Sequence, residues 1–335
     1  MKLFTSLIHI CLVYVMLLIP LSCNQKSQYS VNNDNMDRNE LMLNIRFLAS
    51  DELRGRKVGS PEAKIAARYI VEQFRAAELQ YFKTIGSFMQ VTDFTIDNKQ
   101  VTCINVIGFI EGSNPKLKEE YILLCAHYDH LGVKSNDNSA IEDSIYNGAR
   151  DNAMGVSALI YAAKKLSGLA PARSIIFLAT TGEEEGMLGS KYFVEHCPVN
   201  LKDIVFVLNN DGGGFNDTTL VRIGGDNKID FSSDFWNITS KYDIECIPYP
   251  KDLEYLYEKG DNISFARMGI PSITVSPGFN EIDEEILKYI HKPTDEAKDE
   301  FNYSYLLKFS QVYADLAIKL SSSIEIPGWN EDYRY

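Results

Sequence analysis

The sequence predicts an α/β fold, a three-layer α/β/α sandwich with a central mixed, largely parallel sheet. Short, nearly continuous apolar runs alternate with stretches whose apolar residues recur every three to four positions. The apolar runs are typical of strands buried on both faces of a parallel sheet, and the spaced pattern is typical of helices that pack on it. The chain has 335 residues, 45% hydrophobic and 24% charged. Such a composition is globular, and α/β enzymes of this length often form one domain.

Two helices are predicted before the first strand. Apolar residues recur at helical spacing within residues 39–49, at Leu41, Ile45 and Leu48. A second helix starts at Ser60 and Pro61, because Ser is a favoured N-cap and Pro is favoured at the first helical position. The apolar stripe of this helix, which predicts that it packs on a core, consists of Ala63, Ala66, Ile70, Phe74 and Ala77.

Strands and helices alternate through the rest of the chain. The predicted strands cover residues 101–110, 121–126, 174–180, 204–208 and 272–275. The predicted helices cover residues 153–167 and 303–320 and present apolar residues at 3–4 spacing. We therefore expect one folded domain over residues 38–322, followed by a short, loosely packed tail over residues 323–335.

The first 23 residues have the pattern of a signal peptide. Lys2 supplies a positive charge, residues 3–21 are mostly apolar, and a polar stretch follows at once. The ending Leu21-Ser22-Cys23 resembles the lipobox of bacterial lipoproteins, which implies lipidation at Cys23. Pro20 departs from the aliphatic residue usual in that motif, so a plain cleaved signal and an uncleaved anchor both stay open. All three interpretations predict an exported protein, periplasmic or at the cell surface, and they differ only in the membrane tether, for which we favour a lipid anchor at Cys23.

The segment that follows the signal is polar. Residues 24–37 are rich in Asn, Gln and Ser and have few apolar residues, which predicts a disordered tether. Beyond it lie four cysteines, Cys103, Cys125, Cys197 and Cys246. Four cysteines in an exported protein can pair in three ways. Cys103 and Cys125 fall inside predicted strands, which favours buried free thiols.

The charge balance bears on the partner. The formal net charge is −13. A chain this acidic repels phosphate groups, which argues against a nucleic-acid partner.

Five residues of metal-ligand type follow apolar runs or open a predicted helix. They are His127, Asp151, Glu184, Asp211 and His291. His127, Glu184 and Asp211 come after the carboxyl ends of predicted strands, and ligand sites gather at that edge of an open α/β sheet. Two imidazoles and three carboxylates can hold two divalent ions if one carboxylate is shared. Because paired metals are a recurring device for activating water, the set predicts a metallohydrolase.

Each of these residues also has a structural interpretation when taken alone. Asp151 could cap the helix that begins near Ala153, and Asp211 could belong to a turn, since three glycines follow it. Glu184 could lie in a solvated run of charge at residues 183–185. The common placement at strand ends favours a shared site. So does the fact that three of the five histidines lie in these segments.

The motifs around these residues resemble those of the M28 family of co-catalytic zinc peptidases, which includes aminopeptidases and relatives of glutamate carboxypeptidase. The resemblance runs from about Leu48 to His291 and beyond. The segments that carry it, in the family's order, are Leu48–Arg56 (LASDELRGR), Ala126–Gly132 (AHYDHLG), Gly148–Gly155 (GARDNAMG), Gly182–Ser190 (GEEEGMLGS), Gly269–Pro271 (GIP) and Ile290–Asp295 (IHKPTD). No single segment is specific, but the ordered set is.

The resemblance implies a role for each residue. Asp151 would bridge two metal ions, His127 and Asp211 would complete one site, and Glu184 and His291 would complete the other. Glu183 would be the general base, taking a proton from the attacking water and passing it to the leaving amine. The implied ions are two Zn²⁺, with Mn²⁺ or Co²⁺ as substitutes. The family also implies a cis peptide bond after the bridging aspartate, between Asp151 and Asn152.

Four further residues are candidates for supporting roles. Asp129 is expected to accept the second ring N–H of His127 and fix its tautomer. His130 is expected to be structural. Asp261, in a segment that resembles the family's Ser-Asp-His motif, either lines the site or caps the next helix. Arg150 either reaches a substrate carboxylate or forms a structural ion pair, and we favour the ion pair.

Among functions, an exported aminopeptidase acting on peptides is the leading hypothesis, because an acidic two-metal site suits a cationic substrate amine. No dense arginine cluster marks a pocket for an acidic C-terminal residue, so a glutamate-carboxypeptidase-type carboxypeptidase ranks second. Two further hypotheses are a glutaminyl cyclase, which is a related transferase with a single zinc, and a non-enzymatic metal-binding lipoprotein. The five-ligand set argues against the cyclase, and Glu183 argues against mere metal storage.

Overall fold

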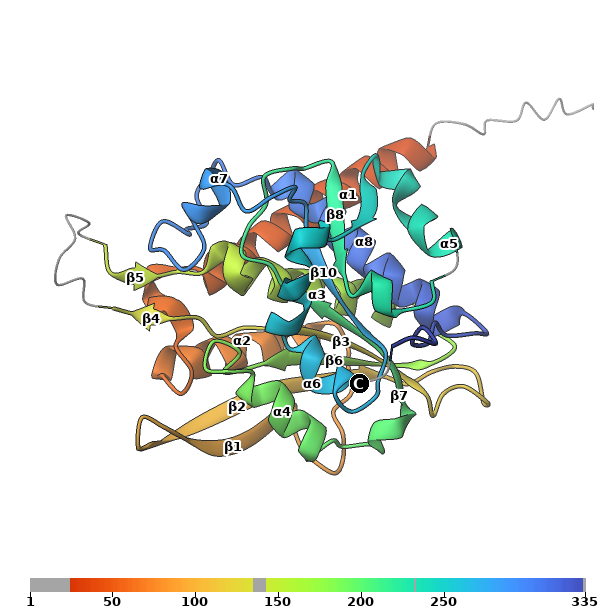
Figure 1. Cartoon of the computed structure of the whole chain (residues 1–335), viewed down its shortest axis with the longest axis horizontal. Coiled ribbons are helices and arrows are strands. Elements are labelled where there is room, and N and C mark those ends of the chain that lie inside the picture. Colours follow the sequence, from red (N-terminus) through yellow and green to blue (C-terminus); the bar gives the residue numbers. More distant parts are fainter. Residues whose placement is uncertain (1–24, 135–142, 232, 334–335) are drawn as a thin grey trace, which may run out of the picture. The chain divides into compact units, whose positions relative to one another are not determined.

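The computed structural model describes residues 25–134, 143–231 and 233–333 (Figure 1). The predicted signal peptide, with Cys23, lies outside these residues. The chain divides into two compact units, Met1–Met36 and Asp37–Tyr335, and the fold below is that of the second. Within the described residues no helix combines the length and apolar content needed to span a membrane.

An eight-stranded mixed sheet forms the middle layer. Its order is β1-β2-β6-β3-β7-β10-β8-β9. The bounds in that order are β1 Met89–Ile96, β2 Lys99–Ile110, β6 Ser174–Thr180, β3 Tyr121–His127, β7 Ile204–Asn210, β10 Ser272–Pro277, β8 Leu220–Gly224 and β9 Glu245–Pro248. The four central strands β6, β3, β7 and β10 are parallel, while β1, β2 and β8 each run antiparallel to a neighbour. A separate two-stranded sheet pairs β4 (Gly132–Val133) with β5 (Ile145–Tyr146).

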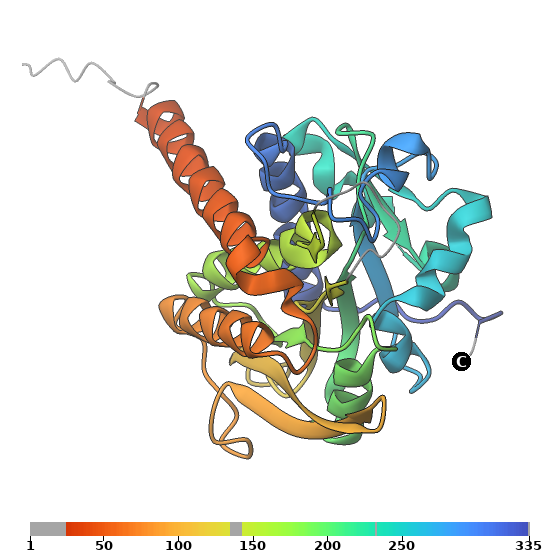
Figure 2. The same ribbon diagram turned by 90° about the vertical axis from the view of Figure 1, so that its left-hand side faces the viewer.

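Helices cover both faces of the sheet (Figure 2). The described helices are α1 Gln25–Leu48, α2 Pro61–Ala76, α3 Met154–Ser167, α4 Leu188–Glu195, α5 Ser233–Trp236, α6 Asn262–Ala266, α7 Glu284–Leu287 and α8 Tyr303–Ser322. Helices α2, α3 and α8 share the larger core with one face of the sheet, and α4 and α6 contribute to a second core on the other face. All seven residues of β6 are buried, as expected for a strand covered on both sides. The predicted three-layer α/β/α sandwich is confirmed.

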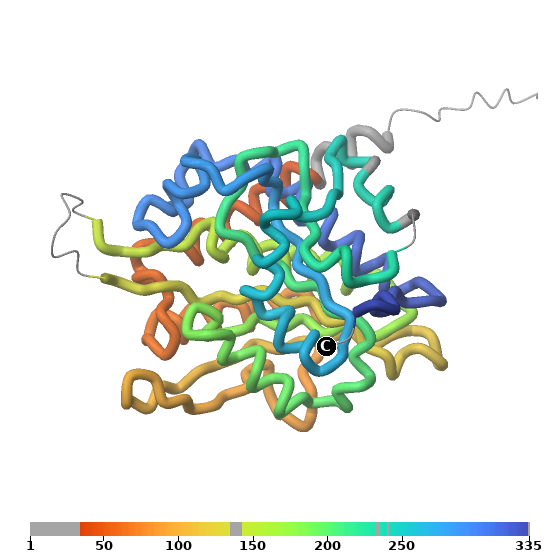
Figure 3. The backbone as a smooth tube through the Cα atoms, in the orientation of Figure 1, coloured from red at the N-terminus to blue at the C-terminus, as the bar shows by residue number. Residues whose placement is uncertain are grey.

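Local signals placed several elements correctly. Ser60 accepts a hydrogen bond from the Ala63 amide at 3.0 Å and so caps α2 as predicted. Cys103 and Cys125 are buried free thiols, and Cys197 and Cys246 are also unpaired. Strands β1, β8 and β9 and the short helices were not predicted: β1 and β9 are the two edge strands of the sheet, and β8, β9 and these helices are brief. Figure 3 traces the backbone through all of these elements.

Two terminal segments differ from the expectation. Helix α1 begins at Gln25 and so includes residues 25–37, where the composition predicts disorder. Residues 24–48 contain no Pro or Gly that would end a helix. The tail is also held more firmly than expected. The Trp329 indole N–H donates to the Gly269 carbonyl at 2.9 Å, and the Trp329 backbone bridges to Ile229.

Candidate metal centre

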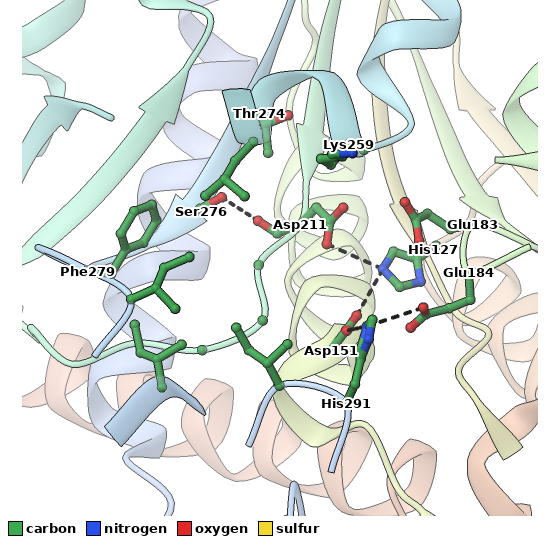
Figure 4. Close-up of a pocket in the computed structure, with 18 of the residues that line it drawn as sticks. His127, Asp151, Glu183, Glu184, Asp211, Lys259, Thr274, Ser276, Phe279 and His291 are labelled. Carbon is green, nitrogen blue, oxygen red and sulfur yellow. Dashed lines mark hydrogen bonds and ion pairs between the residues drawn. The ribbon is translucent and has the colours of Figure 1, made fainter. Parts of the chain in front are cut away.

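The carboxyl ends of the central strands bring three of the predicted ligands together. Strands β3 and β6 are in register from Tyr121 opposite Ser174 to His127 opposite Thr180, so both strands end at the same level. His127 is the last residue of β3, Glu184 lies in the turn after β6, and Asp211 directly follows β7. The edge that the sequence predicts is therefore where these side chains meet (Figure 4).

Two loops, one before α3 and one after α7, supply the other two predicted ligands. Asp151 lies in the turn η2 (Ala149–Ala153) immediately before α3, and the peptide bond between Asp151 and Asn152 is cis, as the resemblance implied. His291 lies in the loop that follows α7 and adopts a left-handed φ of 53°. All five predicted ligands line one cavity.

Asp151 lies between two halves of the cluster. In one half, His127 Nε2 is 3.3 Å from Asp151 Oδ1 and 3.3 Å from Asp211 Oδ1. In the other half, His291 Nε2 is 3.1 Å from Asp151 Oδ2 and 3.3 Å from Glu184 Oε2. The two oxygens of one carboxylate thus face two different imidazoles, the arrangement expected of a ligand shared by two cations.

The cluster has the donors and the spacing for divalent cations. His127, Asp151 and Asp211 form one group whose ligand atoms lie within 4.8 Å of one another, and His130, Asp151 and Glu184 form a second. Two ligand atoms that each lie about 2.0–2.2 Å from a tetrahedral zinc ion are roughly 3.3 Å apart, which matches the separations above. The buried Glu184 Oε1 lies 2.7 Å from His130 Nδ1, a second atom of metal-ligand type in the same group. These residues fit a metal site.

Burial and mutual charge perturb the acids and imidazoles strongly. Burial, together with the charges of nearby acids, raises the pKa of Glu183 to about 10. Burial and Asp151 act to raise the pKa of Glu184, but its contacts with His130 and His291 outweigh them and lower it to about 2. Burial lowers the pKa of His127, yet the charge of Asp211 and the contacts with Asp151 and Asp211 raise it overall. In the protein alone, protons thus neutralise charge that bound cations would otherwise balance.

His130 is closer to the cluster than the sequence suggested. Its Nδ1 atom lies 2.7 Å from Glu184 Oε1 and 3.9 Å from Asp151 Oδ2, and the side chain is fully buried. The prediction of a merely structural His130 is therefore incomplete, because the imidazole lies within the second group of ligand atoms. The turn after β3 directs its ring, and sequence spacing alone does not reveal that direction.

Asp129 supports the cluster in a different way from the one predicted. His127 Nδ1 lies 3.2 Å from the Asp129 backbone oxygen, whereas the Asp129 carboxylate is 3.8 Å away. The carboxylate instead accepts the backbone N–H of Glu183 at 3.2 Å. Asp129 thus contacts His127 mainly through its main chain and uses its side chain to hold the turn that carries Glu183.

Neither Arg150 nor Asp261 lines the cavity. Arg150 Nη1 is 3.1 Å from Asp295 Oδ1, and its guanidinium carbon is 3.5 Å from the centre of the Tyr289 ring, so the favoured structural ion pair is confirmed. Asp295 also accepts the backbone N–H groups of Arg150 and Asp151, which fixes the Asp151 turn. Asp261 is buried and accepts the Thr180 hydroxyl at 2.5 Å. It neither lines the cavity nor caps α6 with its side chain.

Arg56 is a supporting residue that the sequence did not single out. It is fully buried, and its guanidinium donates to the carbonyls of Tyr128 at 2.7 Å, Asn147 at 2.5 Å and Gly148 at 3.1 Å. A fourth hydrogen bond goes to the Leu48 carbonyl. Burial lowers the pKa of Arg56 to about 10, so it stays charged at neutral pH. One side chain thus ties the end of α1 to the loops that carry His130 and Asp151.

We expect Arg56→Met to destabilise the protein by about 3 kcal/mol or more, because four buried carbonyls lose their donor. Urea unfolding followed by circular dichroism measures the change. The control is Arg68→Met, which removes an exposed guanidinium 3.1 Å from Glu72 and should cost about 0.5 kcal/mol or less. Equal midpoints for the two variants would contradict this role.

The cavity beside the cluster has a volume of about 270 Å³. One part carries the acids and imidazoles. The other part is apolar, and its walls are formed by Tyr249, Leu256, Phe279, Ile282, Ile286 and Ile290. Four of these six apolar residues come from the segment between β10 and His291. The cavity is therefore polar at the cluster and fits an apolar group next to it.

The fold and the cluster define an α/β protein that carries, at the carboxyl edge of its sheet, a carboxylate–imidazole cluster able to hold a metal ion. Residues 105–317 match peptidase family M28, and the chain belongs to that family.

Aminopeptidase YwaD of Bacillus subtilis is 27% identical over 248 residues, which cover 72% of this chain and 48% of the relative. The solved structure of BSAP, a zinc aminopeptidase from Bacillus subtilis, has a TM-score of 0.64 at 15% identity and covers 85% of this chain and 95% of that one. A glutaminyl cyclase from Bacteroides thetaiotaomicron has a TM-score of 0.59 at 18% identity and covers 83% and 96%. At these identities the two structures show a shared fold. The chain spans about half or less of the length of the curated relatives it matches.

Proposed function

We propose that this chain is a metal-dependent aminopeptidase that removes an apolar N-terminal residue from peptides. The observation that carries the proposal is the position of Glu183. It lines the cavity beside the cluster, yet among the described residues no imidazole nitrogen lies within 4.0 Å of its carboxylate, whereas each of the three predicted carboxylate ligands has one at 3.3 Å. Metal binding alone does not require this carboxylate, whereas hydrolysis requires a base next to the reacting carbonyl. Family membership and the likeness to an aminopeptidase support the same conclusion.

His127, Asp151 and Asp211 would hold one divalent cation, and Asp151, Glu184 and His291, with His130 beside them, would hold a second. Cations bound there would polarise the scissile carbonyl and acidify water. Two Zn²⁺ ions suit these ligands, and Mn²⁺ or Co²⁺ are possible substitutes.

The protein's own groups would then manage the proton and the substrate. Glu183 takes a proton from the attacking water and gives it to the leaving amine. The hydrogen bond from its backbone N–H to Asp129 keeps the turn that carries it in place. The apolar wall accepts the side chain of the residue being removed, and Phe279, Ile286 and Ile290 select against charged side chains there.

The sequence features of the N-terminus add a location to this proposal. The pattern of residues 1–23 supports export, with a lipid anchor at Cys23 that keeps the enzyme at the membrane surface. Cell fractionation with a Cys23→Ala variant tests it. The anchored protein should sediment with membranes, and the variant should not be lipidated.

The test of the function is to incubate the full-length protein with a mixed peptide pool, with and without a chelator, and to record all products by mass spectrometry. Stepwise loss of apolar N-terminal residues that the chelator abolishes is the expected result. Loss of residues from the C-terminus would contradict the proposal and indicate a carboxypeptidase. Loss of ammonia from peptides that begin with Gln would replace it with a cyclase.

A further inference from the structure

Lys259 brings a cation to the cavity that holds the acidic cluster. It is the last residue of the short helix η6 (Lys251–Lys259) and lines the cavity (Figure 4). Two buried residues of this helix, Leu253 and Tyr257, anchor it, and the Tyr257 hydroxyl donates to the Ser272 carbonyl at 3.0 Å. The next residue, Gly260, packs so closely on the cluster that a Cβ there would lie 3.0 Å from Asp211 Oδ2. The backbone that carries Lys259 is therefore fixed beside the site.

The ammonium of Lys259 forms no ion pair within the part of the chain that the structure describes. Among the described residues, no carboxylate lies within 4.0 Å of it, although four carboxylates line the same cavity. Three of those carboxylates are predicted ligands and the fourth is Glu183. Two divalent cations would balance all four, which leaves the charge of Lys259 uncompensated. A bound substrate that carries a carboxylate would supply the missing negative charge.

The position of Lys259 indicates which end of the substrate it meets. In the view of Figure 4, Lys259 lies over Asp211 on the side toward Glu183, while Phe279 lies on the opposite side of Asp211. The leaving amine must come within reach of Glu183, because Glu183 gives it the proton. The apolar wall near Phe279 receives the residue being removed. Lys259 is thus on the side of the leaving group, which is the part of the substrate that follows the scissile bond.

We infer that Lys259 is a specificity-determining residue that binds a carboxylate on the residue after the scissile bond. Short peptides that carry a carboxylate on that residue are therefore preferred. This inference rests on the proposed function and deepens it. Two sources offer the same chemistry, the terminal carboxylate of a dipeptide and the side chain of an Asp or Glu that follows the scissile bond. A dipeptide with an apolar first residue would fill both the apolar wall and the Lys259 position.

The experiment compares three substrates with the metal-loaded full-length protein: leucyl-alanine, leucyl-alaninamide, and leucyl-aspartic acid amidated at its C-terminal carboxyl. We expect kcat/KM for leucyl-alanine to exceed that for leucyl-alaninamide by roughly fivefold, since water screens an ion pair at an exposed ammonium. The ion pair with Lys259 forms equally in the substrate complex and in the transition state, so the difference in kcat/KM should lie mainly in KM. It should also shrink at high salt. The aspartyl substrate shows whether a side-chain carboxylate serves as well as the terminal one.

Three variants test whether the ratio of the kcat/KM values for leucyl-alanine and leucyl-alaninamide depends on Lys259. Lys259→Gln should bring the ratio close to one, and Lys259→Arg should keep it. Lys251→Gln is the matched control, because Lys251 is exposed at the other end of η6 and does not line the cavity, and its ratio should equal that of the wild type. A wild-type ratio near one, or an unchanged ratio in Lys259→Gln, would overturn the inference while leaving the aminopeptidase intact. Absence of hydrolysis of all three substrates would overturn the proposed function itself.

Discussion

Replacing Glu183 with Gln should lower kcat by about 10²- to 10⁴-fold while bound metal is retained. The two side chains have the same shape, but a neutral amide does not take up a proton from water at neutral pH. Glu183 is not one of the five predicted ligands, and no imidazole of the described residues lies within 4.0 Å of its carboxylate, so its replacement removes no predicted ligand. Steady-state kinetics on a leucine peptide, together with metal analysis of the same preparation, measures both quantities.

Glu185→Gln is the matched control for that variant. Glu185 lies two residues away in the same turn, pairs with Lys57 at 3.3 Å and does not line the cavity. Its variant should behave as the wild type. Unchanged turnover in Glu183→Gln would remove the general-base assignment. Loss of metal together with turnover would instead make Glu183 a ligand.

Replacing Asp151 with Asn should weaken the binding of both cations and abolish activity. The two oxygens of Asp151 face His127 on one side and His291 on the other, so a single substitution removes a charged ligand from both halves of the cluster. Since supporting residues alone can change metal affinity by 10- to 100-fold, loss of a shared ligand should cost more than about 100-fold. Equilibrium dialysis against a metal buffer gives the affinities without a catalytic readout.

Asp211→Asn provides the comparison for Asp151. Asp211 Oδ1 is 3.3 Å from His127 Nε2, and Asp211 belongs to the first group of ligand atoms but not to the second. Its variant should lose affinity for one ion and keep the other. Equal retention of two ions by Asp151→Asn and the wild type would contradict the shared position of Asp151.

Much of the fold and the core of the site could be read from the sequence. The central strands were visible as continuous apolar runs, and their parallel order places residues at the ends of β3, β6 and β7 together. His127 ends β3, Asp211 directly follows β7 and Glu184 lies in the turn after β6, which is why their meeting could be predicted. Asp151 and His291 lie on loops, and the motifs of the family, rather than periodicity, pointed to them.

What the sequence did not reveal depends on the paths of loops and on long-range packing. The ring of His130 reaches Glu184 because of how the turn after β3 folds, and Arg56 is bound by carbonyls far from it in the chain. The carboxylate of Asp129 points to the Glu183 amide rather than to His127 for the same reason. The apolar wall of the cavity combines Tyr249 and Leu256 with the loop before His291, so no single stretch of sequence describes it.

The number of bound cations tests the central claim most directly. The metal-stripped full-length protein would be titrated with Zn²⁺ while bound metal and hydrolysis of a leucine peptide are followed together. Two ions per chain, with hydrolysis restored as the sites fill, is the result that a shared Asp151 and a paired-cation hydrolase predict. A single ion per chain at saturation, with no peptide cleaved and N-terminal Gln converted to pyroglutamate, would contradict it and identify a cyclase.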